Sequence, residues 1–180
     1  MAAAAAGQRF PILAGMDRAT APAASPLGRL STSPDETRAI GRRIGAAAVS
    51  GTVLALIGPL GAGKTQLAKG IAEGLGVTGV VNSPTFVLMN EHSGRLRLYH
   101  IDAYRLDDPE EAMAAGLLDD RQTDGVTVIE WADRLDGWVP ADRLVIRLDT
   151  PPGDPMHRTL HWEAGGPVHE RLAREALVAP

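Results

Sequence analysis

The sequence predicts one α/β domain, and three local patterns support this prediction. Over residues 52–75 a continuous apolar run, typical of a buried strand, is followed by a glycine-rich loop and then by apolar residues at helical spacing. A capped amphipathic helix is predicted just before that run. Residues 84–90 and 96–102 have the pattern of two strands joined by the turn-forming Ser93-Gly94, which indicates an antiparallel hairpin.

The first predicted helix runs from residue 34 to about residue 50. Ser33 supplies a hydroxyl cap, Pro34 occupies the first helical position, and Glu36 follows the cap by three residues, which is the pattern of a capping box. Gly51 can take the left-handed conformation that ends a helix. The apolar positions of one face are Ile40, Ile44 and Ala48.

The glycine-rich loop, residues 58–65, fits the pattern G-x-x-x-x-G-K-[ST]. Such a loop wraps backbone N–H groups around nucleotide phosphates, and its last two residues supply an ammonium group and a magnesium-binding hydroxyl. Its lysine is one of only two among 18 basic residues, so a compact ammonium is kept where a planar guanidinium would not fit. We therefore expect nucleoside triphosphate binding rather than a plain glycine turn. The candidate binding residues are Gly58, Leu60, Gly61, Ala62, Gly63, Lys64, Thr65 and Gln66.

Composition limits the other possibilities. The chain has 180 residues, 44% of them hydrophobic, which is enough for one substantial core. It has no cysteine, so disulfides and thiolate chemistry are excluded. A net charge of −4 argues against a free-standing nucleic-acid binder, so we expect any contact with RNA to be indirect, through a partner. Apolar stretches are too short for a membrane span, and we expect a soluble, cytoplasmic protein.

The remaining elements are predicted from shorter patterns. Residues 1–30 form a tail rich in Ala, Pro and Gly that we expect to be disordered, with Met16 as a possible alternative start, and residues 31–180 form the single domain. The further expected elements are a short helix over 109–115, strands over 126–129, 144–146 and 159–162, and a closing amphipathic helix over 168–177.

Turnover of a nucleotide needs an acidic group near the metal and a group that positions the attacking oxygen. Glu130 ends the strand over 126–129 and is our first choice for holding Mg²⁺, although it could simply face water. Asp102 could orient water or act as a base, or could be only a turn former at the hairpin end. Asp133 lies beyond the strand and is the weaker candidate, since it could merely cap the next turn.

Four other side chains are secondary candidates. Thr85 follows a proline and could place its hydroxyl near the metal or terminal phosphate, or it could be an ordinary strand threonine. Trp131 directly follows Glu130 and is expected near the nucleotide. His100 is expected to support the site, and Arg105 could contact a phosphate or a partner.

Taken in order, these segments resemble the TsaE family, formerly called YjeE, over about residues 31–165. The matching pieces are Glu36-Thr37, the glycine-rich loop, Ser-Pro-Thr-Phe at 83–86, His-Ile-Asp-Ala-Tyr-Arg-Leu at 100–106, and Ile-Glu-Trp at 129–131. The glycine-rich loop is shared with many proteins, whereas the other segments in this order are specific.

The resemblance implies a P-loop NTPase-type α/β fold, with a mainly parallel sheet, antiparallel additions and flanking helices. It also implies ATP and Mg²⁺ as ligands, weak hydrolysis by the protein alone, and action with TsaD and TsaB in making threonylcarbamoyladenosine in tRNA. By motif, Lys64 and the loop amides hold phosphates and Thr65 and Glu130 hold Mg²⁺. Thr85 then belongs to a switch-like segment and Asp102 to the hydrolytic machinery.

The chain departs from the usual family pattern at a few positions, and rival functions stay open. Pro59 stands where an acidic residue is common, Gln66 where threonine is frequent, and Ala132-Asp133 where Pro-Glu is common. The rivals are a small-molecule kinase, a GTP-driven switch, for which no Asn-Lys-x-Asp segment is present, and a scaffold that senses ATP without hydrolysing it.

Overall fold

The computed structural model describes residues 28–106, 112, 116–117, 123–135, 137–154 and 156–178. Its strands are β1 (Arg29–Ser31), β2 (Thr52–Ile57), β3 (Met89–His92), β4 (Leu98–Asp102), β5 (Val126–Glu130), β6 (Leu144–Asp149) and β7 (Arg158–Ala164). Its helices are α1 (Pro34–Ala47), α2 (Lys64–Gly74) and α4 (Gly166–Ala173), with a 3₁₀ turn η2 (Ala132–Leu135) and a π-helical turn η3 (Arg174–Val178). None of the helices in the described part is long and apolar enough to cross a bilayer.

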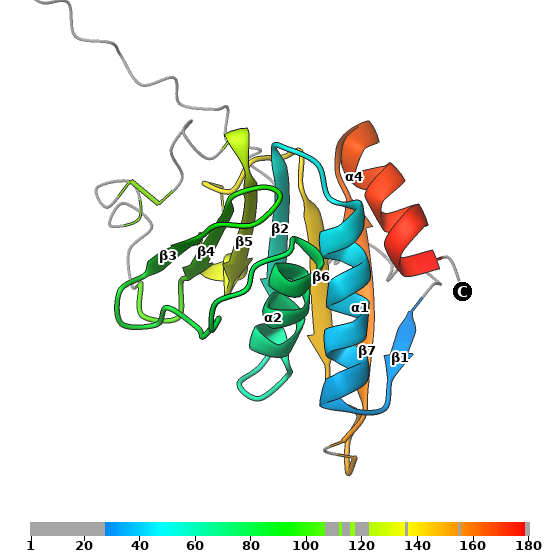
Figure 1. Cartoon of the computed structure of the whole chain (residues 1–180). Helices are drawn as coiled ribbons and strands as arrows, with labels where there is room; N and C mark the ends of the chain where they lie inside the picture. Colours follow the sequence, from blue (N-terminus) through cyan, green and yellow to red (C-terminus); the bar gives the residue numbers. More distant parts are fainter. Residues whose placement is uncertain are drawn as a thin grey trace, which may run out of the picture.

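The described strands form one sheet in the order β1-β7-β6-β2-β5-β4-β3 (Figure 1). The four strands β6, β2, β5 and β4 are parallel to one another. Strand β3 pairs antiparallel with β4, and β7 pairs antiparallel with both β6 and β1. The predicted fold class, a mainly parallel sheet with antiparallel additions, is therefore confirmed. The carboxyl ends of β2, β4 and β5 meet at one edge of the sheet, where ligands bind in folds of this kind.

Helices α1 and α2 pack side by side on one face of the sheet (Figure 1). Glycines let the two backbones approach closely: a Cβ added at Gly45 would lie 2.1 Å from the Ile71 carbonyl oxygen, and one at Gly70 would lie 2.1 Å from that of Arg38. The larger hydrophobic core lies between these helices and the sheet. A smaller core on the opposite face lies partly under η2 and includes Ala55.

Helix α1 begins as predicted but ends earlier. The Ser33 hydroxyl accepts a hydrogen bond from the Glu36 N–H at 3.1 Å, whereas the Glu36 carboxylate accepts from Thr32 rather than from Ser33. These bonds from Thr32 lower the pKa of Glu36. The helix ends at Ala47 instead of Ser50, because the Arg95 guanidinium bonds carbonyl oxygens of its last turn.

Two other boundaries also differ from the prediction. Residues 84–88 form a turn instead of a strand: the Val87 and Leu88 N–H groups both bond the Pro84 carbonyl, and Leu88 has a φ of +65°. The sheet begins at Arg29, two residues before the predicted domain boundary, because β1 pairs with β7. The tail before residue 28 lies outside the described residues, as does the helix expected over 109–115 except for Ala112.

The later strands confirm the prediction and extend it. Strand β5 ends at Glu130, and β6 and β7 are longer than the predicted segments 144–146 and 159–162. The closing helix is present as α4 followed directly by η3. The structure therefore places the glycine-rich loop and two of the predicted carboxylates at ends of adjacent parallel strands.

Candidate nucleotide-binding site

The glycine-rich loop joins β2 to α2 at the carboxyl edge of the sheet, and its backbone conformation requires glycine. Gly58, Gly61 and Gly63 have φ values of +149°, +77° and +100°. A Cβ at Gly58 would also lie 2.4 Å from the Leu148 carbonyl oxygen. The 11-residue helix α2 begins at Lys64, within the last two residues of the motif, so its unpaired N–H groups and positive dipole end lie at the loop. This geometry suits an anion such as a polyphosphate.

Lys64 is buried and folded back onto the loop. Its Nζ donates hydrogen bonds to the carbonyl oxygens of Gly58 at 2.7 Å and Pro59 at 2.9 Å, and it lies 3.6 Å from the centroid of the Trp131 ring. Burial lowers the pKa of Lys64, while the nearby carboxylates of Glu130, Asp133 and Asp102 oppose this shift. The ammonium therefore sits inside the loop with partners that a phosphate group could replace.

Thr65 and Glu130 face each other across the edge of the sheet. The Thr65 hydroxyl donates to Glu130 Oε2 at 2.8 Å, and Glu130 Oε1 lies 2.9 Å from Nε2 of His100. Both Glu130 and His100 are buried. His100 thus contacts one oxygen of Glu130 while the other accepts from Thr65, and its supporting role stays a prediction.

Asp102 is the second carboxylate at this edge and is only 3% exposed. It lies directly opposite Glu130 in the β4–β5 register, so the two side chains share one face of the sheet. Its Oδ2 accepts hydrogen bonds from the hydroxyls of Ser83 and Thr85, the latter at 2.6 Å, and its Oδ1 accepts from the Tyr104 N–H at 2.9 Å. Asp102 therefore fastens the 83–85 segment to the sheet and also bonds the backbone of the turn that follows β4, so both predicted alternatives stay open.

Aromatic side chains lie beside the two carboxylates. Trp131 has a φ of +58°, a left-handed backbone conformation that is uncommon for a bulky residue. Its ring lies 4.9 Å from that of Tyr104, centroid to centroid. A strained residue directly after Glu130, contacting Lys64, is a feature that recurs at functional sites. The structure thus brings Trp131 to Lys64, and its expected place near the nucleotide stays a prediction.

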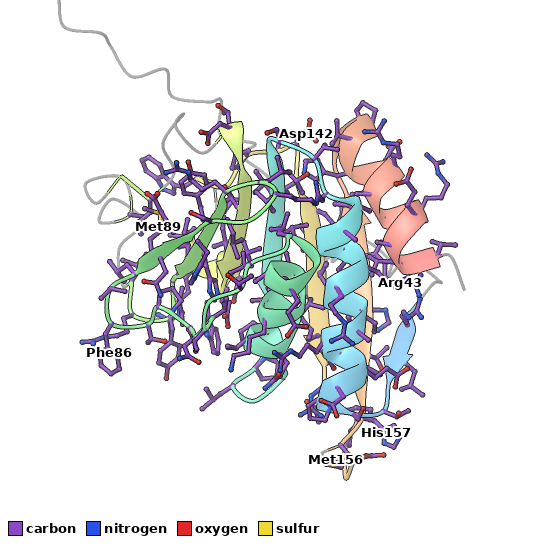
Figure 2. The ribbon with its side chains drawn as sticks, in the orientation of Figure 1. Arg43, Phe86, Met89, Asp142, Met156 and His157 are labelled. Carbon is purple, nitrogen blue, oxygen red and sulfur yellow. The ribbon has the colours of Figure 1, made fainter. Side chains whose placement is uncertain are left out.

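The remaining predicted residues lie around this centre. Leu60 is at the tip of the loop and 80% exposed, and Gln66 lies in the first turn of α2. The Arg105 guanidinium lies 5.3 Å from the centroid of the Phe86 ring. Phe86 itself is 86% exposed and projects outward from the molecule (Figure 2).

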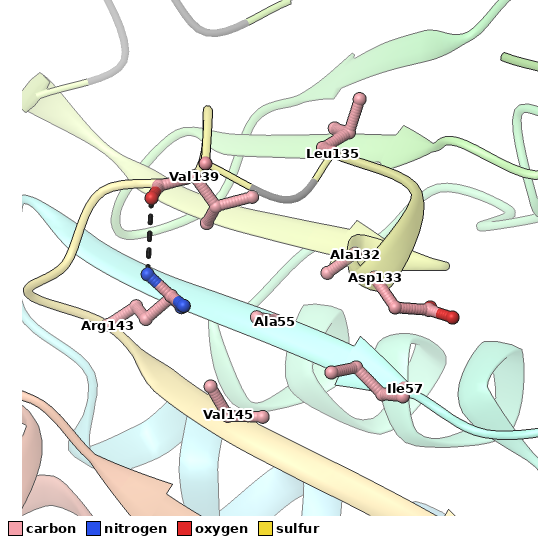
Figure 3. Close-up of a pocket in the computed structure, with 9 residues that line it drawn as sticks. Ala55, Ile57, Ala132, Asp133, Leu135, Val139, Arg143 and Val145 are labelled. Atoms are coloured by element: carbon pink, nitrogen blue, oxygen red, sulfur yellow. Dashed lines mark hydrogen bonds between the residues drawn. The ribbon is translucent and has the colours of Figure 1, made fainter. Parts of the chain in front are cut away.

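Asp133 lies in η2 and lines a shallow cavity of about 200 Å³ on the sheet face opposite α1 and α2 (Figure 3). The floor of the cavity is apolar, with Ala55, Ile57 and Val145 contributed by β2 and β6. Arg143 also lines the cavity and donates a hydrogen bond to the Val139 carbonyl oxygen at 3.1 Å. Among the described contacts none joins Asp133 to Thr65 or Glu130, although its carboxylate is one of those that oppose the lowering of the Lys64 pKa.

The site offers few protein ligands for a cation. Within the described residues no group of three or more His, Cys, Asp or Glu side chains is placed to hold a metal ion. The Thr65 hydroxyl and the Glu130 carboxylate, 2.8 Å apart, are nevertheless oxygen ligands of the kind that Mg²⁺ accepts. Magnesium is commonly held by one or two protein oxygens together with substrate phosphates and water. The residues present therefore fit Mg²⁺ as part of a nucleotide complex.

Two residues at the site had no assigned role in the sequence analysis. Ser83 lies in a motif segment that was noted, and its position two residues before Thr85 could have suggested a second hydroxyl ligand for Asp102. Arg158 donates hydrogen bonds to the Gly61 and Ala62 carbonyl oxygens, at 2.9 Å each. It lies more than ninety residues after the loop, and no local sequence signal indicates that contact.

Known proteins resemble this chain over most of its length. A family model described as "Threonylcarbamoyl adenosine biosynthesis protein TsaE" matches residues 31–159. The tRNA threonylcarbamoyladenosine biosynthesis protein TsaE of Bacillus subtilis is 42% identical over 81% of this chain and 90% of that protein. The protein of the same name from Streptomyces coelicolor is 40% identical over 76% of this chain and 93% of its own length.

A solved structure shows the same fold. The crystal structure of Bacillus subtilis YdiB aligns with a TM-score of 0.69 and 36% sequence identity, and the alignment covers 83% of this chain and 93% of YdiB. The sequence matches, the shared fold and the glycine-rich loop with its paired Thr65 and Glu130 all agree. The chain belongs to the TsaE family of threonylcarbamoyl adenosine biosynthesis proteins.

Proposed function

We propose that this protein binds and hydrolyses ATP with Mg²⁺ as one subunit of the cytoplasmic machinery that forms threonylcarbamoyladenosine. The modified base is adenosine 37 of tRNAs that read codons beginning with adenine, and the protein acts there with TsaD and TsaB. The observation that carries the proposal is a group of side chains at the loop: Lys64 bonds the loop carbonyls, and Thr65 bonds Glu130. Asp102 lies directly opposite Glu130 in the pairing of β4 with β5. Membership of the TsaE family supports a role in threonylcarbamoyladenosine formation, and this group of side chains supports the binding and hydrolysis of ATP.

Each side chain has a role that its position favours. The loop N–H groups and Lys64 would hold the β- and γ-phosphates once the ammonium exchanges its bonds to the Gly58 and Pro59 carbonyls for phosphate oxygens. Thr65 and Glu130 would hold Mg²⁺, which would neutralise charge on the phosphate oxygens. Trp131 packs on the ammonium and helps to exclude water from it.

Asp102 is placed to serve the hydrolytic step. Water attacks the γ-phosphorus, the bond to the bridging oxygen breaks, and ADP and phosphate leave. A buried carboxylate near that water could orient it or accept its proton. In the structure the Asp102 oxygens are held by Ser83, Thr85 and the Tyr104 N–H. Turnover therefore depends on how the 83–85 segment rearranges, and contact with partner proteins is a natural way to control it.

Two rival functions would give different results. A small-molecule kinase needs an acceptor pocket and a mobile lid, but the segment after α2 leads into the β3–β4 hairpin, which speaks against such a lid. A scaffold that senses ATP without hydrolysing it would use the same binding residues. A Glu130→Gln variant that keeps both ATP binding and tRNA modification would favour the scaffold.

Steady-state ATP hydrolysis by the purified chain, alone and with TsaD and TsaB from the same organism, tests the proposal. Modified tRNA is scored in the same reactions. We expect low activity alone, higher activity with both partners, and modification that depends on ATP. High activity alone with no response to partners or tRNA would contradict the proposal and favour a kinase or a free-standing ATPase.

A further inference from the structure

Arg158, the first residue of β7, joins the end of that strand to the phosphate loop. Its Nε donates to the Ala62 carbonyl oxygen and its Nη2 to the Gly61 carbonyl oxygen, both at 2.9 Å, while its Nη1 donates to the carbonyl oxygen of His157 at 2.7 Å. One guanidinium thus binds two neighbouring carbonyl groups of the loop.

The two loop carbonyls that Arg158 binds belong to successive peptide groups. All described peptide bonds are trans, so the N–H of each peptide points away from its carbonyl oxygen. Fixing the carbonyls of Gly61 and Ala62 toward Arg158 therefore fixes the N–H groups of Ala62 and Gly63 away from it. The Ala62 N–H closes the turn onto the Pro59 carbonyl at 3.1 Å, so the Gly63 N–H is the one of the two that Arg158 directs away from itself without a bond inside this turn.

A guanidinium suits this task better than other side chains. Its planar fork presents several N–H groups in fixed directions, so it can bind two neighbouring carbonyls at once. The loop needs such support because Gly61 and Gly63, with positive φ values, are the residues that lose most conformational freedom when ordered. A loop that is already ordered loses less entropy when a ligand binds.

We propose that Arg158 is a positioning residue for nucleotide binding: it sets the peptide planes of the phosphate loop so that the Gly63 N–H faces the phosphates before nucleotide arrives. This inference rests on the proposed nucleotide-binding function and adds a residue to that site. Arg158 contacts the loop backbone, and its effect on the phosphates is exerted through that backbone.

The test compares Arg158→Gln and Arg158→Lys with Arg147→Gln. Arg147 is an exposed residue of β6 that shares the Val145 face of the sheet, away from α1 and α2, so its substitution removes the same charge without touching the loop. ATP and ADP dissociation constants are measured by calorimetry on the full chain. Amide hydrogen exchange of the loop and the thermal midpoint are measured without nucleotide.

Loss of two bonds from a charged donor predicts that Arg158→Gln binds both nucleotides about 10- to 100-fold more weakly, with faster exchange confined to the loop. Arg158→Lys recovers only part of the affinity, and Arg147→Gln matches the natural protein. The thermal midpoint of each variant stays within about 3 °C of the natural protein.

Two results would overturn the inference. One is Arg158→Gln binding nucleotide within twofold of the natural protein. The other is an affinity loss accompanied by faster exchange throughout the fold, which would mark Arg158 as a general structural residue. Failure of the natural protein itself to bind nucleotide would instead overturn the proposed function.

Discussion

Two parts of the candidate site are held in different ways. The phosphate loop is anchored at both ends by packed elements: it joins β2 to α2, and α2 is locked against α1 through glycine contacts that leave no space for a side chain, while Arg158 adds two bonds to the loop backbone. The 83–88 segment is attached by hydroxyl–carboxylate bonds to Asp102, and its Phe86 and Val87 side chains are exposed. A packed element keeps one shape, whereas a segment held by a few polar bonds can exchange them. The contrast suggests that the packed part binds nucleotide and the tethered part controls turnover.

The largest expected effect on stability comes from a substitution that disrupts the packing of α1 against α2. Gly45→Val would drive a side chain into the Ile71 backbone, which cannot move without separating the helices, and should lower the free energy of unfolding by about 3 kcal/mol. Phe86→Ser, in the exposed turn, should change it by less than about 0.5 kcal/mol. Urea unfolding of both variants measures the difference. An equal loss of unfolding free energy in the two variants would contradict the distinction between the packed helices and the tethered 83–88 segment.

Nucleotide affinity should depend strongly on Lys64. Lys64→Ala removes a buried ammonium at the loop and should raise the ATP dissociation constant at least about 100-fold, because charge-assisted bonds to phosphate are lost. Circular dichroism should show that the fold survives. Lys69→Ala, on the same helix but outside the loop, is the matched control and should bind normally. Normal affinity in Lys64→Ala would disprove the assignment of the loop.

A substitution in the tethered 83–88 segment should lower the rate of ATP hydrolysis and leave ATP binding unchanged. Ser83→Ala removes one of the two hydroxyls on Asp102, so we expect hydrolysis in the complex with TsaD and TsaB to fall about tenfold while the KM for ATP stays unchanged. Ser93→Ala, in the exposed β3–β4 turn, is the control. A raised KM with an unchanged kcat would place Ser83 in nucleotide binding instead.

A smaller effect is expected from the buried ammonium of Lys64 as pH changes. Burial holds its pKa below the ordinary value of 10.5, so the folded protein disfavours the charged form more than the unfolded chain does. The resulting destabilisation is fully present below the folded pKa and disappears as pH rises through 10.5. The thermal midpoint of the natural protein should therefore rise relative to that of Lys64→Met as pH increases toward 10.5. A difference between the two midpoints that stays constant with pH would contradict a lowered pKa for Lys64.

The sequence predicted the phosphate loop and its flanking elements better than the segment that Asp102 tethers. The loop, its flanking strand and helix, and the paired carboxylates at strand ends are encoded locally or by strand register, and the structure brings them together as expected. The 84–88 segment was predicted as a strand because Thr85, Phe86 and Val87 favour strands. The structure makes it a turn, since the Pro84 carbonyl and the Asp102 carboxylate together bind its polar groups.

Long-range guanidinium contacts could not be predicted at all. Arg95 ends α1 and Arg158 holds the phosphate loop, each through backbone carbonyls distant in sequence. Backbone carbonyls carry no residue-specific signal, and the chain is rich in arginine. Only the folded arrangement distinguishes these two residues from the other arginines.

The most direct test of the division between binding and turnover is a paired measurement on Asp102→Asn. Its ATP dissociation constant is measured by calorimetry, and its hydrolysis rate is measured in the complex with TsaD and TsaB. We expect an affinity within about twofold of the natural protein and a hydrolysis rate at least about 100-fold lower, because the amide has no carboxylate to orient or deprotonate water. Unchanged hydrolysis, or a loss of affinity as large as that of Lys64→Ala, would contradict this division.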